Sequence, residues 1–333
     1  MGTTEKKIVF IYPGSVGAVL QLIPLANALR KAWPAVRCTL LTSPEIAPLA
    51  RLVPQFDDII VCDETKYKGM LGVPRLSELL KPYDFDIAFC LRTGERWAMA
   101  ARLAGITRRL GYDTGHAGWF LTDKIPLPVR SERVRHEGLL SLLGIDIEEK
   151  LVELELPREV KENYWKVQDR YGLAGNDYIV ICPFAGEPAK CLTQATASHL
   201  ARHWHEKKRR VYLIGSFEQG EALEKIAKFA NLPYTQVLAG KLSLPELTVF
   251  LSRAALLISV DAGPLYLAQT VNCPSVGVFG PTLPPEGRMF TRGTKILFKK
   301  ADCAPCYEKQ ELCKNYYCLG NISALEIIRA AEE

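Results

Sequence analysis

The segment from Leu256 to Thr282, LLISVDAGPLYLAQTVNCPSVGVFGPT, constrains the fold of this chain most. It begins with an apolar run of the length of a buried parallel strand, which Asp261 to Pro264 interrupt. Asp is a good helix N-cap, Gly frees the backbone and Pro suits a first helical turn, so a helix should begin here and end before Pro274. A second apolar run, Ser275 to Phe279, follows. The segment predicts a strand–helix–strand unit of a parallel α/β sheet.

The turn between the first strand and the helix is a candidate anion site. A helix that begins there points unpaired N–H groups and the positive end of its dipole into the crevice where open α/β sheets bind phosphorylated ligands. One interpretation is that this turn contacts the diphosphate of a nucleotide-sugar through Asp261, Ala262, Gly263, Pro264 and Leu265. The alternative is an ordinary strand–helix turn, which Asp-x-Gly-Pro would also make.

Length and composition indicate two domains. With 333 residues, 48% of them hydrophobic and 24% charged, the chain can bury two cores of ordinary size. The longest apolar stretch, Val19 to Leu29, is interrupted by Gln21, Pro24 and Asn27, so no transmembrane helix is expected. Nor does the chain show the charged and apolar regions of a signal peptide. We therefore expect a cytoplasmic protein.

The formal net charge of +5 is modest. No basic stripe is interleaved with aromatic residues, so nucleic acid is not an expected partner. The charge suits an anionic small molecule or peripheral contact with an acidic membrane surface.

Strand and helix patterns alternate along the first half of the chain. A strand from Lys7 to Tyr12, a small-residue loop from Pro13 to Gly17 and a helix from Leu20 to Trp33 resemble the opening of a Rossmann unit, without the G-x-G-x-x-G motif. Further strands are predicted at Cys38 to Thr42, Asp58 to Cys62, Ile87 to Leu91 and Arg108 to Tyr112. Such alternation is typical of a doubly wound parallel sheet.

The same pattern restarts with a strand from Tyr178 to Cys182 and includes a short strand from Val237 to Gly240. The charged, extended residues from Asp146 to Pro157 suggest a hinge between the halves. We therefore predict an α/β protein of two Rossmann-like, doubly wound domains that face a cleft, residues 1–155 and 156–333.

Three loops of the second half place polar residues at the carboxyl ends of predicted strands. They contain Glu187 and Lys190, then Glu218 and Glu221, and finally Asp261. A lysine and a helix N-terminus can neutralise a diphosphate leaving group without a divalent metal. A glutamate after a Gly-Ser turn can accept hydrogen bonds from ribose hydroxyls. The alternative for each side chain is an ordinary position on the exposed surface.

These motifs occur in a recognisable order: PFAGEPAK, LIGSFEQGE, LAGKLSLPEL and SVDAGPLYLAQTVNCPSVGVFGPT. Together with KIVFIYPGSVGAVLQLIPLANALRK, AGITRRLGY and RHEGLLSLLGID, they make the chain resemble glycosyltransferase family 9, the ADP-heptose–lipopolysaccharide heptosyltransferases, over nearly its whole length. The resemblance implies a GT-B fold and inverting, metal-independent transfer of a heptose-type sugar from a nucleotide-sugar, usually ADP-heptose. The implied acceptor is an anionic saccharide or glycolipid of the lipopolysaccharide core at the inner face of the membrane.

The resemblance also implies which residues bind the donor. Lys190 would contact the phosphates, and Glu221 or Glu218 would hold the adenosine ribose. The turn at Asp261, Gly263 and Pro264 would bind the donor sugar and diphosphate. The second half would thus be the nucleotide-sugar domain.

On the acceptor side, in the first half, the resemblance points to Ser15, Gly17, Arg92 and Arg96. The family's first loop usually reads Ser-x-Gly-Asp, and its aspartate is the expected general base. Here the fourth position is Ala18. Loss of a positioned base typically costs about 10²–10⁴-fold in rate.

The donor motifs also depart from the family. Its Asp-Ser-Gly-x-x-His ends here in Tyr266, with alanine in place of the serine, and its Lys-Arg-Trp reads Lys190-Cys-Leu. Two explanations remain open. Either another carboxylate, such as Glu95 or Glu187, serves as the base, or the chain is a catalytically degenerate homologue that binds a nucleotide-sugar or a partner protein.

Four of the ten cysteines, Cys303, Cys306, Cys313 and Cys318, lie in one loop, residues 303–318. A Cys-x-x-Cys pair followed by two further thiols suits a structural zinc or iron site. Reduced thiols and disulfides remain alternatives, although a reducing cytosol disfavours the latter. Four thiolates would leave the ion no open position, so we expect no cofactor for catalysis.

One predicted helix of the second half carries three histidines. His199 and His203 have the i, i+4 spacing of metal ligands, and His205 follows them. No acidic residue lies at a suitable position beside them, so we expect an exposed helix face.

Overall fold

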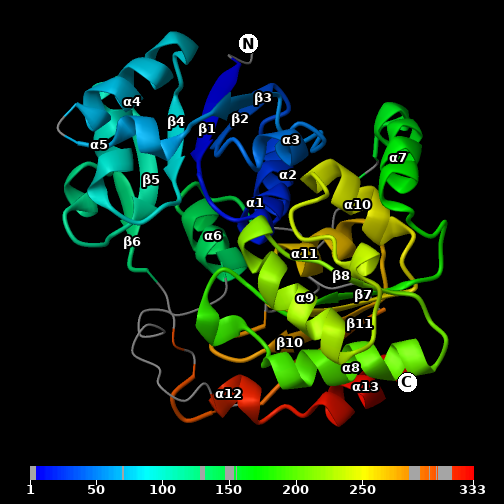
Figure 1. Cartoon of the computed structure of the whole chain (residues 1–333). Coiled ribbons are helices and arrows are strands. Elements are labelled where there is room, and N and C mark those ends of the chain that lie inside the picture. The colour runs from blue at the N-terminus through cyan, green and yellow to red at the C-terminus, as the bar shows by residue number, and fades with distance from the viewer. Residues whose placement is uncertain are drawn as a thin grey trace. The chain divides into compact units, whose positions relative to one another are not determined.

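A computed structural model describes residues 5–69, 71–127, 132–146, 154, 156–284, 293–299, 301–304, 306 and 317–333. The chain divides into two compact units, residues 1–150 (unit 1) and 151–333 (unit 2), each with a parallel sheet (Figure 1). Among the helices of the described residues, none is long and apolar enough to cross a bilayer.

Unit 1 contains a six-stranded sheet in the order β3-β2-β1-β4-β5-β6, and all neighbouring strands are parallel. The strands are β1 (Lys6–Ile11), β2 (Val36–Thr42), β3 (Asp58–Val61), β4 (Ile87–Cys90), β5 (Arg108–Tyr112) and β6 (Asp123–Ile125). This is the strand order of dinucleotide-binding Rossmann folds. The strands β1 to β3 are added toward one edge of the sheet and β4 to β6 toward the other, so the order of strands reverses between β1 and β4. The central strand β1 is apolar because helices cover both faces of such a sheet, and its Ile8 to Phe10 are completely buried.

The helices of unit 1 are α1 (Val16–Leu20), α2 (Ile23–Ala32), α3 (Ala47–Ala50), α4 (Gly72–Leu80), α5 (Glu95–Leu103) and α6 (Glu132–Ser141). The helix predicted from Leu20 to Trp33 is observed as α2, but it begins only at Ile23, and Leu20 instead ends the separate helix α1. Pro24 lies in the first turn of α2. Proline has no N–H and its ring would clash with the carbonyl of Leu20, so one continuous helix cannot form.

Unit 2 contains a five-stranded sheet in the order β11-β10-β9-β7-β8, again with all neighbouring strands parallel. The strands are β7 (Ile179–Cys182), β8 (Val211–Leu213), β9 (Leu256–Val260), β10 (Ser275–Phe279) and β11 (Thr294–Phe298). This is the flavodoxin-like order, which reverses direction between β7 and β9.

The helices of unit 2 are α7 (Arg158–Tyr171), α8 (Gln194–Glu206), α9 (Gly220–Phe229), α10 (Leu244–Ser252), α11 (Gly263–Thr270), α12 (Tyr317–Gly320) and α13 (Ala324–Glu332). The rings of Tyr178, Tyr212 and Phe250 pack together at centroid distances of 4.6–5.3 Å. The buried Tyr178 hydroxyl donates to the Phe250 carbonyl at 2.7 Å. These contacts join β7, β8 and α10 on one face of the sheet.

Sequence analysis missed the edge strands β6 and β11. β6 has only three residues, and every residue of β11 is half-buried, so neither makes the apolar run of an interior strand. The strand predicted from Val237 to Gly240 was also wrong. Only a single bridge joins Val237 to Leu213, and Gly240 turns the chain away at φ +63°.

Candidate functional site

The point where strand order reverses in unit 2 brings together two loops that are distant in sequence. Lys190 lies in the loop after β7 and Asp261 directly follows β9. The two strands are parallel neighbours, with Cys182 opposite Ser259, so their carboxyl ends lie side by side. Open α/β sheets bind their ligands in the crevice at such a reversal.

Lys190 forms ion pairs with both acidic residues of these loops. Its Nζ lies 3.3 Å from Asp261 Oδ2 and 3.0 Å from Glu187 Oε2. The Lys190 side chain is only 16% exposed. Burial lowers the pKa of Lys190, but the negative charges of Asp261 and Glu187 outweigh it, so the pKa is raised above the ordinary lysine value. The loops therefore hold a partly buried cation that stays charged at neutral pH.

Asp261 does not cap the helix that follows it, contrary to the prediction. The N-cap of α11 is Ala262, in an extended conformation and without a side-chain hydrogen bond. The Asp261 carboxylate instead accepts hydrogen bonds from Tyr266 Oη to Oδ1 at 2.8 Å and from Thr282 Oγ1 to Oδ2 at 2.6 Å. With Lys190 these give it three partners, which is more than a cap would provide.

The first turn of α11 therefore has no side chain bonded to its amides. Ala262, Gly263 and Pro264 are half-buried, so their backbone is accessible. Leu265 differs from the prediction because its side chain is fully buried and its N–H donates to the Ala262 carbonyl at 3.0 Å. Leu265 anchors the helix in the core and leaves neither side chain nor amide for a ligand.

Gln219, which sequence analysis did not single out, connects the loop after β8 to the loop after β7. Its Nε2 donates to the Ala185 carbonyl at 3.0 Å, and its Oε1 accepts from the Ser216 N–H at 3.0 Å. Ser216 and Gln219 form a capping box, and the spacing Ser-x-x-Gln is the signal that could have identified it. Gln219 thus holds two of the three predicted loops together.

The two glutamates of the β8 loop face solvent. Glu221 is 82% exposed and pairs with Lys225 one helical turn away at 2.6 Å. Glu218 is also exposed, and its pKa is lowered by a hydrogen bond from the Ser216 hydroxyl. Both carboxylates are ionised and accessible, and neither contributes to the Lys190 cluster.

Next to these glutamates, Phe217 presents an exposed aromatic ring. Its side chain is 80% exposed, although the loop that carries it is tightly packed. The Gly240 N–H donates to the Gly215 carbonyl at 3.0 Å, and a Cβ on Gly240 would lie 2.9–3.1 Å from Phe217 atoms. Only glycine fits this close approach at positive φ. The backbone of Phe217 is therefore fixed, and its ring is an exposed, flat apolar surface.

In unit 1 the reversal of strand order lies between β1 and β4, and it brings together the predicted acceptor-side loops. Ser15 is the N-cap of α1, and its Oγ accepts from the Ala18 N–H at 3.4 Å. Gly17 and Ala18 are buried. Glu95, the exposed first residue of α5, follows the neighbouring strand β4 and so belongs to the same edge of the sheet.

The two predicted acceptor-side arginines have different surroundings. Arg92 is exposed. Arg96 is half-buried, donates to the Tyr67 carbonyl at 3.4 Å, lies 3.8 Å from Glu64 and stacks on Trp97 at 4.8 Å. Arg96 thus connects α5 to the turn Glu64–Tyr67, whereas Arg92 is accessible to a ligand.

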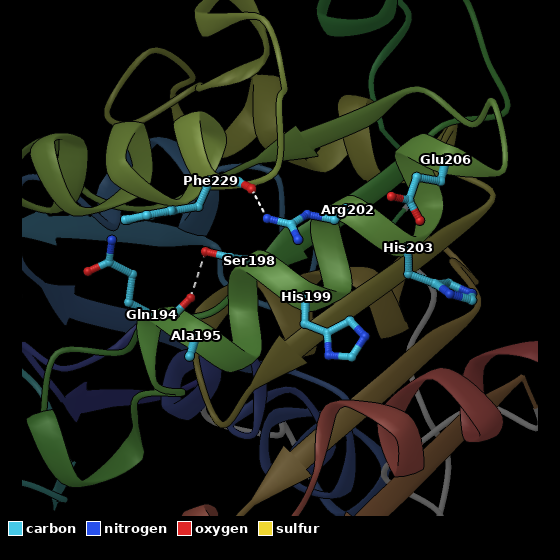
Figure 2. Close-up of a pocket in the computed structure, with 8 residues that line it drawn as sticks. All are labelled: Gln194, Ala195, Ser198, His199, Arg202, His203, Glu206 and Phe229. Carbon is cyan, nitrogen blue, oxygen red and sulfur yellow. Dashed lines mark hydrogen bonds between the residues drawn. The ribbon is translucent and has the colours of Figure 1, made fainter.

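A pocket of about 790 Å³ lies on the outer face of α8 beside Phe229 of α9 (Figure 2). His199 points outward there, while His203 Nε2 lies 2.8 Å from Glu332 Oε1 of α13. Within the described ranges, no three His, Cys, Asp or Glu side chains are placed to hold a metal ion. His199 fits the predicted exposed face, and His203 instead connects α8 to α13.

The predicted cysteine site lies only partly within the described residues. Cys313 is outside them, while no disulfide joins Cys303, Cys306 and Cys318. The Cys306 thiol donates to the Cys303 carbonyl at 2.8 Å, and Cys318 is buried. The structural metal site therefore stays a prediction.

Known proteins resemble the chain over nearly its full length. Lipopolysaccharide heptosyltransferase 3 of Escherichia coli is 24% identical over 330 residues, which cover 95% of this chain and 96% of that protein. A glycosyl transferase family 9 structure from Veillonella parvula matches with a TM-score of 0.83 at 21% identity, covering 100% of this chain and 98% of that one. E. coli ADP-heptose lps heptosyltransferase II matches with a TM-score of 0.78 at 19% identity, covering 98% and 97%.

At these identities the two structures speak for the fold alone, and they confirm the predicted GT-B architecture. The family itself is shown by a separate match. Residues 73–317, well over half of the chain, match the model of "Glycosyltransferase family 9 (heptosyltransferase)". The chain therefore belongs to glycosyltransferase family 9, the heptosyltransferases.

Proposed function

We propose that this heptosyltransferase uses a nucleotide-sugar, ADP-heptose in particular, and transfers its heptose with inversion to a saccharide of the lipopolysaccharide core or a related glycolipid. The observation that carries the proposal is the partly buried Lys190–Asp261 ion pair where strand order reverses in unit 2. A fixed cation beside uncapped helix amides suits the developing charge of a diphosphate leaving group. Neither a metal ion nor a cofactor takes part in the proposed reaction.

Unit 2 would hold the donor. The diphosphate would meet Lys190 and the backbone of Ala262 to Pro264, which no side chain caps. The exposed ring of Phe217 would stack on the base, and the exposed Glu218 or Glu221 would accept hydrogen bonds from the ribose. Base–aromatic stacking contributes about 1–3 kcal/mol, so Phe217 would be a substantial part of nucleotide affinity.

Unit 1 would hold the acceptor, with the exposed Ser15 and Arg92 facing it and the buried Gly17 shaping the loop that carries Ser15. Anionic groups of a core saccharide would pair with such cations. Since the acceptor carries a lipid anchor, the protein would work in the cytoplasm and contact the inner face of the membrane peripherally.

Of the two candidate bases, Glu95 is favoured over Glu187. Glu95 begins α5 at the same sheet edge as Ala18, where the family has its aspartate, and it is exposed. Glu187 already neutralises Lys190. Buried Ala18 itself cannot accept a proton, and this observation keeps a second candidate function open. In that case the protein binds a nucleotide-sugar or a partner protein without turnover.

A single assay separates these alternatives. The full chain is incubated with ADP-heptose and a deacylated core saccharide, ADP release is measured, and the anomeric configuration of the product is read by NMR. We expect turnover with inversion, loss of turnover in Glu95→Gln, and retention in Glu45→Gln, an exposed glutamate elsewhere in unit 1. Donor binding without ADP release would instead support the non-catalytic function. Absence of ADP binding at millimolar concentration would exclude both turnover and nucleotide-sugar binding and leave only the binding of a partner protein.

The cysteine loop calls for a separate measurement. Metal analysis of the purified protein, before and after chelation, is expected to find one zinc or iron per chain. Because the proposed role is structural, chelation should lower the melting temperature without abolishing donor binding.

A further inference from the structure

The two carboxylates that neutralise Lys190 are held very differently. Asp261 is 12% exposed, and its two oxygens accept hydrogen bonds from Tyr266 and Thr282 in addition to contacting the lysine. The Glu187 side chain is 55% exposed, and its contact is with Lys190, three residues further along the same short loop. One partner is thus built into the fold, and the other is a surface side chain on a flexible stem.

This arrangement conflicts with direct binding of a diphosphate. A lysine already neutralised by two carboxylates offers little net positive charge to a third anion. A phosphate placed against Lys190 while Glu187 remained there would also bring two like charges into contact in a partly buried loop. One of the resident carboxylates therefore has to leave.

Glu187 is the partner that can leave at low cost. Exposed ion pairs of this kind contribute little to stability, because solvent screens them and the long side chains lose freedom when they pair. Releasing Asp261 would instead break two hydrogen bonds from hydroxyl groups and leave a carboxylate with little solvent around it. The structure thus separates a permanent counterion from an exchangeable one.

We propose that Glu187 is an internal, displaceable anion that occupies Lys190 until the diphosphate of the donor replaces it, while Asp261 stays in place. The inference rests on the proposed function, in which Lys190 binds the diphosphate. Because Glu187 competes with the diphosphate for Lys190, it lowers the affinity of the site for anionic donors. Ligands with too little charge to displace Glu187 are rejected.

Calorimetric titration of the full chain tests this proposal. ADP and inorganic pyrophosphate are titrated separately into the wild type, Glu187→Gln, Glu187→Ala and Asp261→Asn. Glu224→Gln removes the same charge from an exposed position on α9 and serves as the control. In both Glu187 variants the Kd for either anion should fall by up to about fivefold, as expected for loss of one weak competing ion pair. It should stay unchanged in Glu224→Gln. In Asp261→Asn it should rise, because Lys190 then loses the fixed carboxylate that holds its ammonium group at the loop after β9.

The two anions distinguish the possible failures. If the wild type binds ADP and the Glu187 variants bind it equally or more weakly, the displaceable anion is wrong while the proposed donor stands. If ADP fails to bind but pyrophosphate binds and tightens in Glu187→Gln, the nucleotide donor is wrong while the exchange on Lys190 stands. If neither anion binds to any variant, both proposals fail.

Discussion

The loops where strand order reverses in unit 1 and unit 2 have the same position in similar sheets, but they are equipped differently. In unit 2, charged and polar side chains connect the loops directly: Lys190 contacts Asp261 across the reversal, and Gln219 reaches the β7 loop from the β8 loop. In unit 1, the loop after β1 buries Ala18, and the exposed residues Arg92 and Glu95 follow β4.

The difference separates two requirements of a transfer reaction. Charge that stabilises a leaving group must be fixed before the reaction, because dipoles that reorganise during the reaction lose their advantage. A general base needs reach and a suitable pKa, and several positions around an acceptor can supply it. Unit 2 has the preorganised network, whereas unit 1 has Ala18 where the resemblance predicts the base and carries the exposed Glu95 at the same sheet edge. The following predictions test this contrast, beginning with the largest expected effect.

Restoring the family's aspartate should have the largest effect, and it tests the second candidate function, in which the chain has no base. If only the base is missing, Ala18→Asp should raise kcat by about 10²–10⁴-fold, the usual contribution of a positioned base. The assay is ADP release from ADP-heptose with a core acceptor. Ala18→Asn, which has the shape of aspartate without its basicity, is the matched control.

Ala18 is buried, so melting temperatures must accompany the kinetics of both variants. A folded Ala18→Asp protein with wild-type turnover would show that unit 1 already has its base elsewhere, as proposed for Glu95. The contrast between the units would then be smaller than their loops suggest.

Removing the cation of unit 2 should cost about 10²–10³-fold in kcat/KM, as loss of a single preorganised donor does in other enzymes. Lys190→Met keeps most of the volume of the side chain but leaves Asp261 and Glu187 without their counterion. Lys228→Met, on the exposed face of α9, is the control. Comparable losses in both variants would point to a general charge effect and contradict a specific role for Lys190.

Removing single hydrogen bonds to the Asp261 carboxylate should have a smaller effect on the kinetics. Tyr266→Phe and Thr282→Val each remove one hydrogen bond to the carboxylate, worth about 1.5 kcal/mol, or roughly a tenfold change. We expect the donor KM to rise by this factor in each variant while kcat changes less. Steady-state kinetics with varied donor measure it. Tyr234→Phe, an exposed tyrosine elsewhere in unit 2, should behave as wild type.

The smallest effect concerns pH. The pKa of Lys190 is raised, so its charge persists below that value and is lost only as pH rises through it, above the ordinary lysine range. The Kd for ADP should therefore change less than about twofold between pH 7.5 and 9.5. Calorimetry at several pH values checks this. A steep loss of affinity within that interval would mean that Lys190 titrates there and is not held by its two carboxylates.

Local patterns were sufficient to predict most interior elements and the loops that carry the candidate site. The apolar run before Asp261 and the proline after it define a strand and a helix without reference to the rest of the chain. The same reasoning failed where a partner decided the outcome. The Asp261 carboxylate accepts hydrogen bonds from the hydroxyl groups of Tyr266 and Thr282 and does not cap the helix. The local sequence pattern does not show that these hydroxyl groups lie beside it.

By itself, the sequence determined the alternation of strands and helices, the resemblance to family 9 and the presence of Ala18 where that resemblance predicts a base. Tertiary structure alone decided that β7 lies beside β9 and β1 beside β4. Strand order depends on pairing between segments far apart in the chain, which local propensity does not encode. That pairing places Lys190 against Asp261, and it also leaves Glu187 as the exposed partner of the two.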